Sequence, residues 1–243
     1  MKCRVAIAGM YGRMGSTVAD LAEHDPDVIL VGGIVLEARN RVGHERLLVS
    51  LLVKEVMEMG DVLVDFTTPE GVITHLGELG LFKEPKAAVV GVTGFDESHM
   101  AKLEAASLTM PIVYDTNFSM GIALLKEAIA SFGGNLKGMD MAIVETHRRD
   151  KKDAPSGTAT DLAHLAARHH GRVPPISSLR LGEAPGEHRV FISNESEMIE
   201  LTHRANSRAA FAKGALAAAK WVKGKKPGLY SFRDVFQSGT KSR

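Results

Sequence analysis

The first half of the chain alternates short apolar runs with longer amphipathic or polar segments, which is typical of a parallel sheet with crossover helices. Strands are predicted over residues 3–8, 28–36, 61–66, 87–92 and 111–114. A helix with apolar positions at i, i+4, i+7 and i+8 follows the first strand, from Met14 to just before Pro26. Four strand ends carry glycine, threonine or asparagine, so we expect a ligand crevice at the carboxyl ends of the strands.

The second half contains alternating segments, which are typical of antiparallel strands half exposed to solvent. Strands are predicted over 141–145, 188–193 and 198–203, and helices over 122–132, from about 155 to 170, and over 207–222. The change of pattern near residue 118 predicts a domain boundary. The fold class that follows is α/β, with a parallel-sheet domain and a second, mixed domain.

Composition narrows the class of protein. The 243 residues carry a net charge of +1 and are 44% hydrophobic, which favours a globular protein and argues against a nucleic-acid or membrane-surface partner. Cys3 is the single cysteine, so no intrachain disulfide can form. No apolar run is long enough for a signal peptide or a membrane span, so we expect a cytoplasmic protein.

A glycine-rich turn follows the first predicted strand. Gly9, Gly12 and Gly15 lie three residues apart, which departs from the usual dinucleotide-binding spacing but still opens the backbone to a pyrophosphate at a helix start. A tight turn without a ligand is the alternative. Glu37, at the end of the second predicted strand, is placed to accept hydrogen bonds from the ribose of an adenosine. Arg13 and Arg39 could meet a 2′-phosphate, so NADH and NADPH both remain open.

A charged run from His147 to Asp153 connects a predicted strand to the turn Ser156-Gly157-Thr158. A histidine can transfer a proton near neutral pH, and the hydroxyl and backbone of the turn could hold a carboxylate at a helix start. A solvated charged loop is the alternative interpretation. Metal binding is not expected, because His164, His169 and His170 lack partners at ligand spacing. The sequence also lacks a Walker A motif and a G-x-S-x-G motif.

The chain resembles the dihydrodipicolinate (4-hydroxy-tetrahydrodipicolinate) reductases of lysine biosynthesis over nearly its whole length. The matching segments lie at residues 5–9, 12–15, 64–67, 69–71, 91–95, 116–121, 145–147, 151, 153–159, 186–188, 200–205, 207–208, 226–230 and 233–235. The resemblance implies hydride transfer from NADH or NADPH to a cyclic dicarboxylate, in a homotetramer. It also implies a Rossmann-type domain, residues 1–118 and 213–243, and an α+β domain for substrate binding and tetramerisation, residues 119–212.

Site residues carry over position by position. His147 matches the acid/base and Lys151 the proton donor, while Gly157 and Thr158 match residues that hold a substrate carboxylate. Arg148 and Ser156 are added as carboxylate-binding residues from their chemistry. The implied cofactor-binding residues are Gly9, Met10, Tyr11, Gly12, Arg13, Met14, Glu37, Gly91, Val92, Thr93, Asp115, Thr116, Asn117 and Phe118.

The chain departs from the family pattern at a few positions. Arg148 and Asp150 stand where the family usually has histidines, and Val92 stands where threonine is common. Many members have an arginine directly after the ribose-binding acid, whereas here Glu37 is followed by Ala38 and then Arg39. The segments 37–61 and 170–187 are shorter than in many members, which predicts trimmed loops. Two other functions stay open: a Rossmann reductase of another amino or keto diacid, and a non-catalytic NAD(P)-binding protein.

Overall fold

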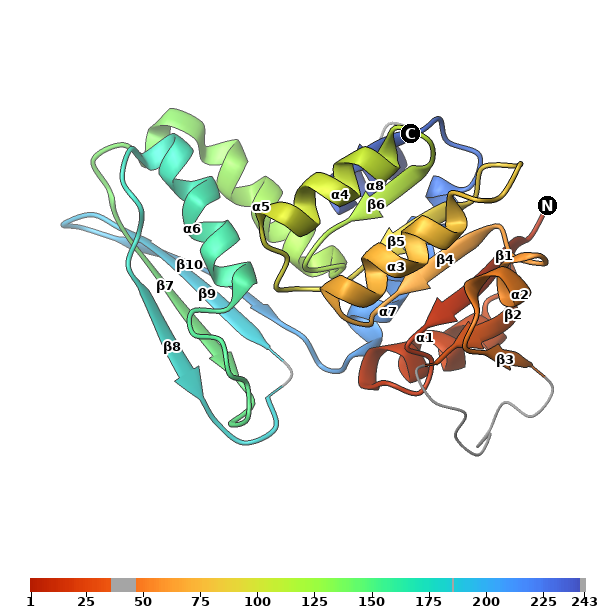
Figure 1. The fold of residues 1–243 in the computed structure, drawn as a ribbon. Coiled ribbons are helices and arrows are strands. Elements are labelled where there is room, and N and C mark those ends of the chain that lie inside the picture. Colours follow the sequence, from red (N-terminus) through yellow and green to blue (C-terminus); the bar gives the residue numbers. More distant parts are fainter. Residues whose placement is uncertain (36–46, 185, 241–243) are drawn as a thin grey trace. The chain divides into compact units, whose positions relative to one another are not determined.

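The computed structural model describes residues 1–35, 47–184 and 186–240, and the chain forms two compact units. Unit 1 comprises residues 1–118 and 211–243, and unit 2 comprises residues 119–210. The chain therefore leaves unit 1 after one sheet is nearly complete and returns to it with a C-terminal segment (Figure 1).

Unit 1 is built on a parallel sheet of seven strands in the order β11-β6-β5-β4-β1-β2-β3. Its central strands are buried along their whole length because helices cover both faces, which explains their continuous apolar runs. The strands are β1 (Cys3–Ala8), β2 (Val28–Ile34), β3 (Leu48–Ser50), β4 (Val62–Asp65), β5 (Ala87–Val90), β6 (Pro111–Tyr114) and β11 (Gly228–Tyr230).

The helices of unit 1 pack on the two faces of this sheet. Figure 1 shows α3 and α4 in front of the sheet and α7 behind it. Leu76 of α3 and Leu103 of α4 belong to one core cluster with Leu63 of β4. The helices are α1 (Arg13–His24), α2 (Val53–Met57), α3 (Pro69–Leu79), α4 (Glu97–Ser107), α7 (Ala209–Val222) and α8 (Phe232–Thr240).

Unit 2 is a mixed four-stranded sheet, in the order β10-β9-β7-β8, with α5 and α6 on one face. Strand β7 pairs antiparallel with β9 and parallel with β8. Ile129 of α5, Leu162 of α6 and Ile143 of β7 lie in a common core. The elements are α5 (Met120–Phe132), a 3₁₀ turn η1 (Gly133–Leu136), β7 (Asp140–His147), α6 (Gly157–His170), β8 (Ile176–Arg180), β9 (Glu187–Ser193) and β10 (Met198–Arg204).

The predicted fold class is confirmed, and several elements were missed. No helix was predicted after the strand at 61–66, but Thr68 caps α3 by accepting a hydrogen bond from the Gly71 N–H, and Pro69 suits the first helical turn. Strand β8 was also not predicted, because Ser177 and Ser178 hide its pattern. In the described ranges, no helix is long and apolar enough to cross a membrane.

Candidate active site

In the glycine-rich turn between β1 and α1, the backbone at Gly15 packs closely against the backbone at Gly9. Gly9 has a φ of +75°, and a Cβ on Gly15 would lie 2.0 Å from the Gly9 carbonyl oxygen. Gly12 is the N-cap of α1 and offers no side-chain hydrogen bond to the first turn. The N–H groups of that turn therefore face outward without a side-chain cap, which suits a phosphate at the positive end of the helix.

A pocket of about 560 Å³ adjoins this turn within unit 1. Gly9, Gly12 and Tyr11 line one part of it, and Thr67 and His75 line another. The His75 Nδ1 lies 2.7 Å from an oxygen of the buried Asp65, whose other oxygen accepts hydrogen bonds from the Thr67 N–H and hydroxyl. A bare glycine cradle beside a pocket of this size fits the phosphates and adenosine of a dinucleotide.

The other predicted cofactor loops follow neighbouring strands. Gly91, Val92 and Thr93 follow β5, and residues 115–118 follow β6, so both segments reach the same edge of the sheet as the glycine turn. Met10, Val92 and Phe118 have buried side chains, which leaves their backbone groups as the available contacts. Phe118 packs against Phe66 and Phe232. Glu37, Ala38 and Arg39 lie outside the described residues.

Asp115 has a mainly structural role at this edge. One of its carboxylate oxygens accepts a hydrogen bond from the Asn117 N–H at 3.1 Å, and the other accepts one from the Phe232 N–H at 3.3 Å. The first bond shapes the loop after β6, and the second links that loop to α8. Of the remaining predicted residues, Arg13 and Met14 begin α1, and Thr116 lies in the loop after β6.

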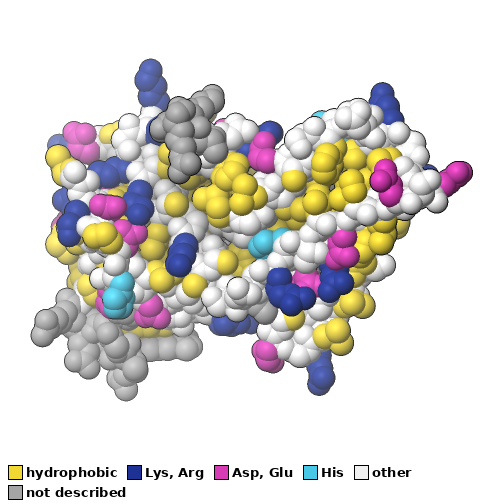
Figure 2. Space-filling model, turned by 180° about the vertical axis from the view of Figure 1, so that it is seen from behind, with side chains coloured by type: hydrophobic (Ala, Val, Ile, Leu, Met, Phe, Trp, Pro, Cys, Tyr) yellow, Lys and Arg dark blue, Asp and Glu magenta, His cyan; other side chains and the backbone are white. Residues whose placement is uncertain are grey.

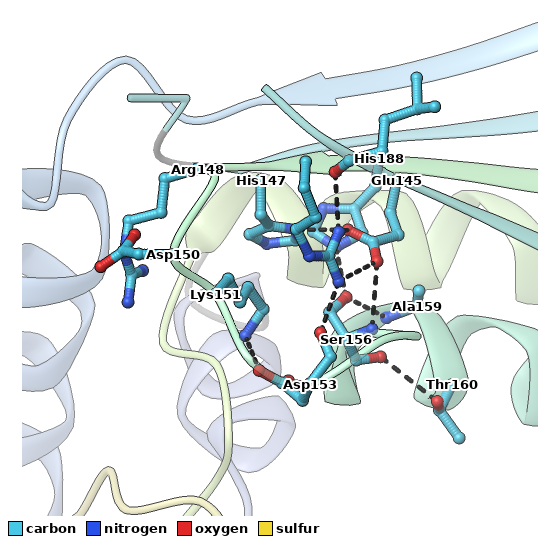
Figure 3. A network of polar contacts seen from close by, with 12 residues as sticks. Glu145, His147, Arg148, Asp150, Lys151, Asp153, Ser156, Ala159, Thr160 and His188 are labelled. Carbon is cyan, nitrogen blue, oxygen red and sulfur yellow. Dashed lines mark hydrogen bonds and ion pairs between the residues drawn. The ribbon is translucent and has the colours of Figure 1, made fainter. Parts of the chain in front are cut away.

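Glu145 is the centre of a second polar cluster, which lies in unit 2 (Figure 3). Its carboxylate is fully buried and receives two hydrogen bonds from Arg180, at 2.9 and 3.0 Å, and one from the Ser156 N–H at 3.3 Å. Burial alone would raise the pKa of Glu145, but the bonds from Arg180, Ser178 and His147 lower it to about 2. Glu145 is therefore a fixed negative charge at neutral pH.

His147 ends β7 and is oriented by that charge. Its Nδ1 hydrogen-bonds the second oxygen of Glu145, so the neutral ring carries its proton on Nδ1 and leaves Nε2 as the open nitrogen. Burial lowers the pKa of His147; Glu145 opposes the shift, and the positive charges of Lys151 and Arg180 add to it. A histidine of this kind can accept and return a proton at Nε2 near neutral pH.

The predicted charged residues after His147 are partly engaged with one another. The Lys151 ammonium lies 2.7 Å from Asp153, and the Arg148 guanidinium lies 2.6 Å from Asp150. Figure 3 shows Arg148 and Asp150 apart from the network around Glu145, whereas Lys151 lies next to it. Lys151 is thus placed beside His147, whereas the Arg148 guanidinium is paired with Asp150.

The turn Ser156-Gly157-Thr158 forms the start of α6. The Ser156 hydroxyl accepts a hydrogen bond from the Ala159 N–H at 3.2 Å, and Gly157 is exposed. A Cβ on Gly157 would meet no atom within 4 Å, so open space lies beside this helix start. The structure brings the turn together with Glu145 and His147, as the Ser156 N–H bond shows.

Arg180, His188 and His203 were not predicted as site residues. Arg180 pairs with His147 across β8 and β7, and its role was missed with the strand itself. The His188 Nε2 lies 3.3 Å from the Ser156 hydroxyl, and the two rings of His147 and His188 meet edge to face at 5.2 Å. Glu145, His188 and His203 stand in the family-matching segments 145–147, 186–188 and 200–205, and that match was the signal available in the sequence.

His170 belongs to the packing of unit 2. Its ring nitrogens contact the backbone oxygens of Met139, at 2.7 Å, and Arg172, at 3.0 Å. Among the residues with a described position, no group of three or more histidine, cysteine or carboxylate side chains is arranged to hold a metal ion.

A parallel sheet with a glycine-rich turn at a helix start is typical of the nucleotide-binding Rossmann class, and a carboxylate-held histidine is a candidate acid/base group. Family models agree with this class: "Dihydrodipicolinate reductase, N-terminus" matches residues 3–118, and "Dihydrodipicolinate reductase, C-terminus" matches residues 121–236. The chain belongs to the dihydrodipicolinate reductase family.

Individual relatives and one solved structure extend this result. The 4-hydroxy-tetrahydrodipicolinate reductase of Rubrobacter xylanophilus is 40% identical and covers 97% of this chain and 98% of its own. The protein of that name from Aquifex aeolicus is 37% identical, with coverage of 97% and 99%. A dipicolinate-bound dihydrodipicolinate reductase from Paenisporosarcina sp. TG-14 has the same fold, with a TM-score of 0.81 and 23% identity, covering 96% of this chain and 99% of that one.

Proposed function

We propose that this chain reduces 4-hydroxy-tetrahydrodipicolinate with NADH or NADPH, and that unit 1 binds the nucleotide while unit 2 binds the dicarboxylate. The reaction follows from the family, which the chain matches along almost its full length. The bound nucleotide supplies a hydride. The observation that carries the assignment of unit 2 is the Glu145–His147 pair beside Lys151 and the start of α6.

His147 and Lys151 are the proposed proton-transfer residues. Glu145 holds the His147 ring through Nδ1, so the open Nε2 is the atom that exchanges a proton with the substrate. Lys151 provides a second N–H donor and a positive charge next to it. The 4-hydroxyl leaves the substrate as water, and hydride addition to the resulting unsaturated ring leaves negative charge that must be protonated. Two donors at one place suit this reaction.

Carboxylate binding is assigned to the 156–158 turn and Arg148. The N–H groups at the start of α6 and the positive end of its dipole favour an anion, and Gly157 leaves room for it. Arg148 adds a bidentate donor once it leaves Asp150. A substrate with two carboxylates thus explains the dense positive charge around residues 148–152 in a chain with a net charge of only +1.

Assembly and location form part of the proposal. We expect a homotetramer, because the sheet face of unit 2 not covered by α5 and α6 leaves Leu179 and Met198 exposed. Figure 2 shows hydrophobic side chains next to charged ones on the side of the molecule opposite to that of Figure 1. The relatives are reductases by name, and we expect a cytoplasmic location for this chain.

A coupled assay tests the reaction. Pyruvate, aspartate semialdehyde and the upstream synthase would generate the substrate, and the loss of NADH or NADPH absorbance would be followed in parallel. We expect oxidation that depends on the synthase. Nucleotide binding without oxidation would contradict the proposed reaction and favour a different diacid or a non-catalytic role.

A further inference from the structure

Two histidines of unit 2, the buried His188 and the partly buried His203, each contact the N-cap serine of a helix. The His188 Nε2 lies 3.3 Å from the hydroxyl of Ser156, the N-cap of α6, and the His203 Nε2 lies 3.1 Å from the hydroxyl of Ser119, the N-cap of α5. The two histidines face each other across β9 and β10. Of the two caps, only that of α6 belongs to the proposed carboxylate turn.

His188 is buried on all sides and is uncharged at neutral pH. It is 3% exposed, and the titratable groups that face it are Glu145 and His147 of β7, His203 of β10 and Lys151 of the following loop. Burial lowers the pKa of His188 to about 3, and the charges of His147 and His203 add to this shift. The ring therefore carries a single N–H.

Hydrogen bonding decides which nitrogen carries that proton. The His188 Nδ1 is buried and has no hydrogen-bond partner among the residues whose positions are described. Because an orphaned buried N–H is rarer than an orphaned acceptor, the proton belongs on Nε2, where it is donated to the Ser156 oxygen. That oxygen already accepts the Ala159 N–H, so both of its lone pairs are occupied.

Because the Ser156 oxygen already accepts two hydrogen bonds, the Ser156 hydroxyl can make a further hydrogen bond only as a donor, through its own proton. We propose that His188 is a positioning residue that turns the Ser156 hydroxyl proton toward a substrate carboxylate at the 156–158 turn. This inference rests on the proposed function, which places a carboxylate there. His203 and Ser119 repeat the arrangement at α5, outside that turn, and provide an internal control.

Three variants separate positioning from packing. His188→Phe keeps a ring against His147 but removes the hydrogen bond to Ser156. His188→Gln restores a side-chain amide near the place of Nε2. His203→Phe makes the same ring replacement at the α5 cap. Each is compared with the wild type for Tm, NADPH affinity, KM and kcat, and for dipicolinate affinity by calorimetry.

For His188→Phe we expect KM and the dipicolinate Kd to rise about tenfold, with kcat and NADPH affinity within about threefold of wild type. His188→Gln should recover most of the loss, and His203→Phe should lower Tm without changing KM. An unchanged KM in His188→Phe, no recovery in His188→Gln, or an equal rise in His203→Phe would overturn the inference.

The calorimetry also keeps the two proposals apart. If the wild type binds dipicolinate but does not turn over the substrate, the proposed reaction fails, and the three dipicolinate affinities still decide the role of His188. If the wild type binds no dipicolinate, the turn is not a carboxylate site and the inference fails with it.

Discussion

Glu145 is the residue on which the geometry of the candidate site depends. Its buried carboxylate forms hydrogen bonds with the Arg180 guanidinium, the Ser156 N–H and the His147 ring. A buried ion pair costs desolvation, and loss of one partner leaves the other charge uncompensated. The residue therefore joins the stability of unit 2 to the orientation of the proposed proton-transfer residue.

The depressed pKa of Glu145 predicts how stability depends on pH. Its stabilising contribution is fully present above the ordinary value of 4.5 and is lost as the pH falls through about 2. Glu145→Gln should lower the free energy of unfolding by on the order of 3 kcal/mol at neutral pH, because Arg180 loses its partner. Urea titrations of both proteins should show the gap closing only below about pH 4.5. A gap already closing between about pH 7 and 5 would contradict this account.

At the scale of elements, strands β1, β2, β4, β5 and β6 of unit 1 were predicted because most of their positions are buried, whereas β3 and β11, whose positions are half-exposed or exposed, were not. A strand such as β4, which is buried at every position, gives a continuous apolar run that the sequence shows directly. Helix α3 and strand β8 could not be predicted in the same way. The start of α3 contains Thr68 and Pro69, which also suit a turn, and β8 alternates between half-exposed and exposed positions.

The candidate site could be predicted only where its residues are close together in the sequence. His147, Lys151 and the 156–158 turn are close in sequence, so their spacing suggested a common site. Arg180 and His188 reach that site through the pairing of β8 and β9 with β7, which a single sequence does not display. The side chains of Met10 and Phe118, which are predicted at the cofactor loops, are buried in the core, so a cofactor would meet only their backbone groups.

The turn between β1 and α1 gives a prediction at this scale. A Cβ at position 15 would lie 2.0 Å from the Gly9 carbonyl oxygen, so Gly15→Ala must push the helix away from the strand end. We expect NADPH affinity to fall at least tenfold and Tm to drop, because turn and helix shift together. Gly77→Ala is the matched control, since a Cβ there meets no atom within 4 Å. Equal affinities in the two variants would contradict the proposed role of the turn.

At the scale of the whole molecule, the chain separates its two tasks between units with different sheets. The parallel sheet of unit 1 directs its loops to one edge, whereas the mixed sheet of unit 2 covers one face with helices and leaves hydrophobic side chains on strands β8 and β10 exposed. An exposed apolar face on a sheet is a common basis for self-association.

Light scattering on the purified protein tests that expectation. The proposed homotetramer predicts a mass four times the 26.2 kDa of the chain. Leu179→Lys should reduce the mass, because it places a charge on a side chain that is 45% exposed and would be covered by self-association. Nucleotide affinity, which belongs to unit 1, is the control for folding. A monomeric wild type would contradict the proposed assembly.

The central claim is that reduction takes place at the Glu145–His147 site, and steady-state kinetics of His147→Gln test it most directly. Glutamine removes the ring nitrogen Nε2, which accepts and returns the proton, and leaves unit 1 unchanged. With the substrate generated in the assay and NADPH saturating, we predict kcat reduced by roughly 10²–10⁴ and an unaltered NADPH Kd. A kcat equal to that of the wild type would remove His147 from the mechanism and contradict the claim.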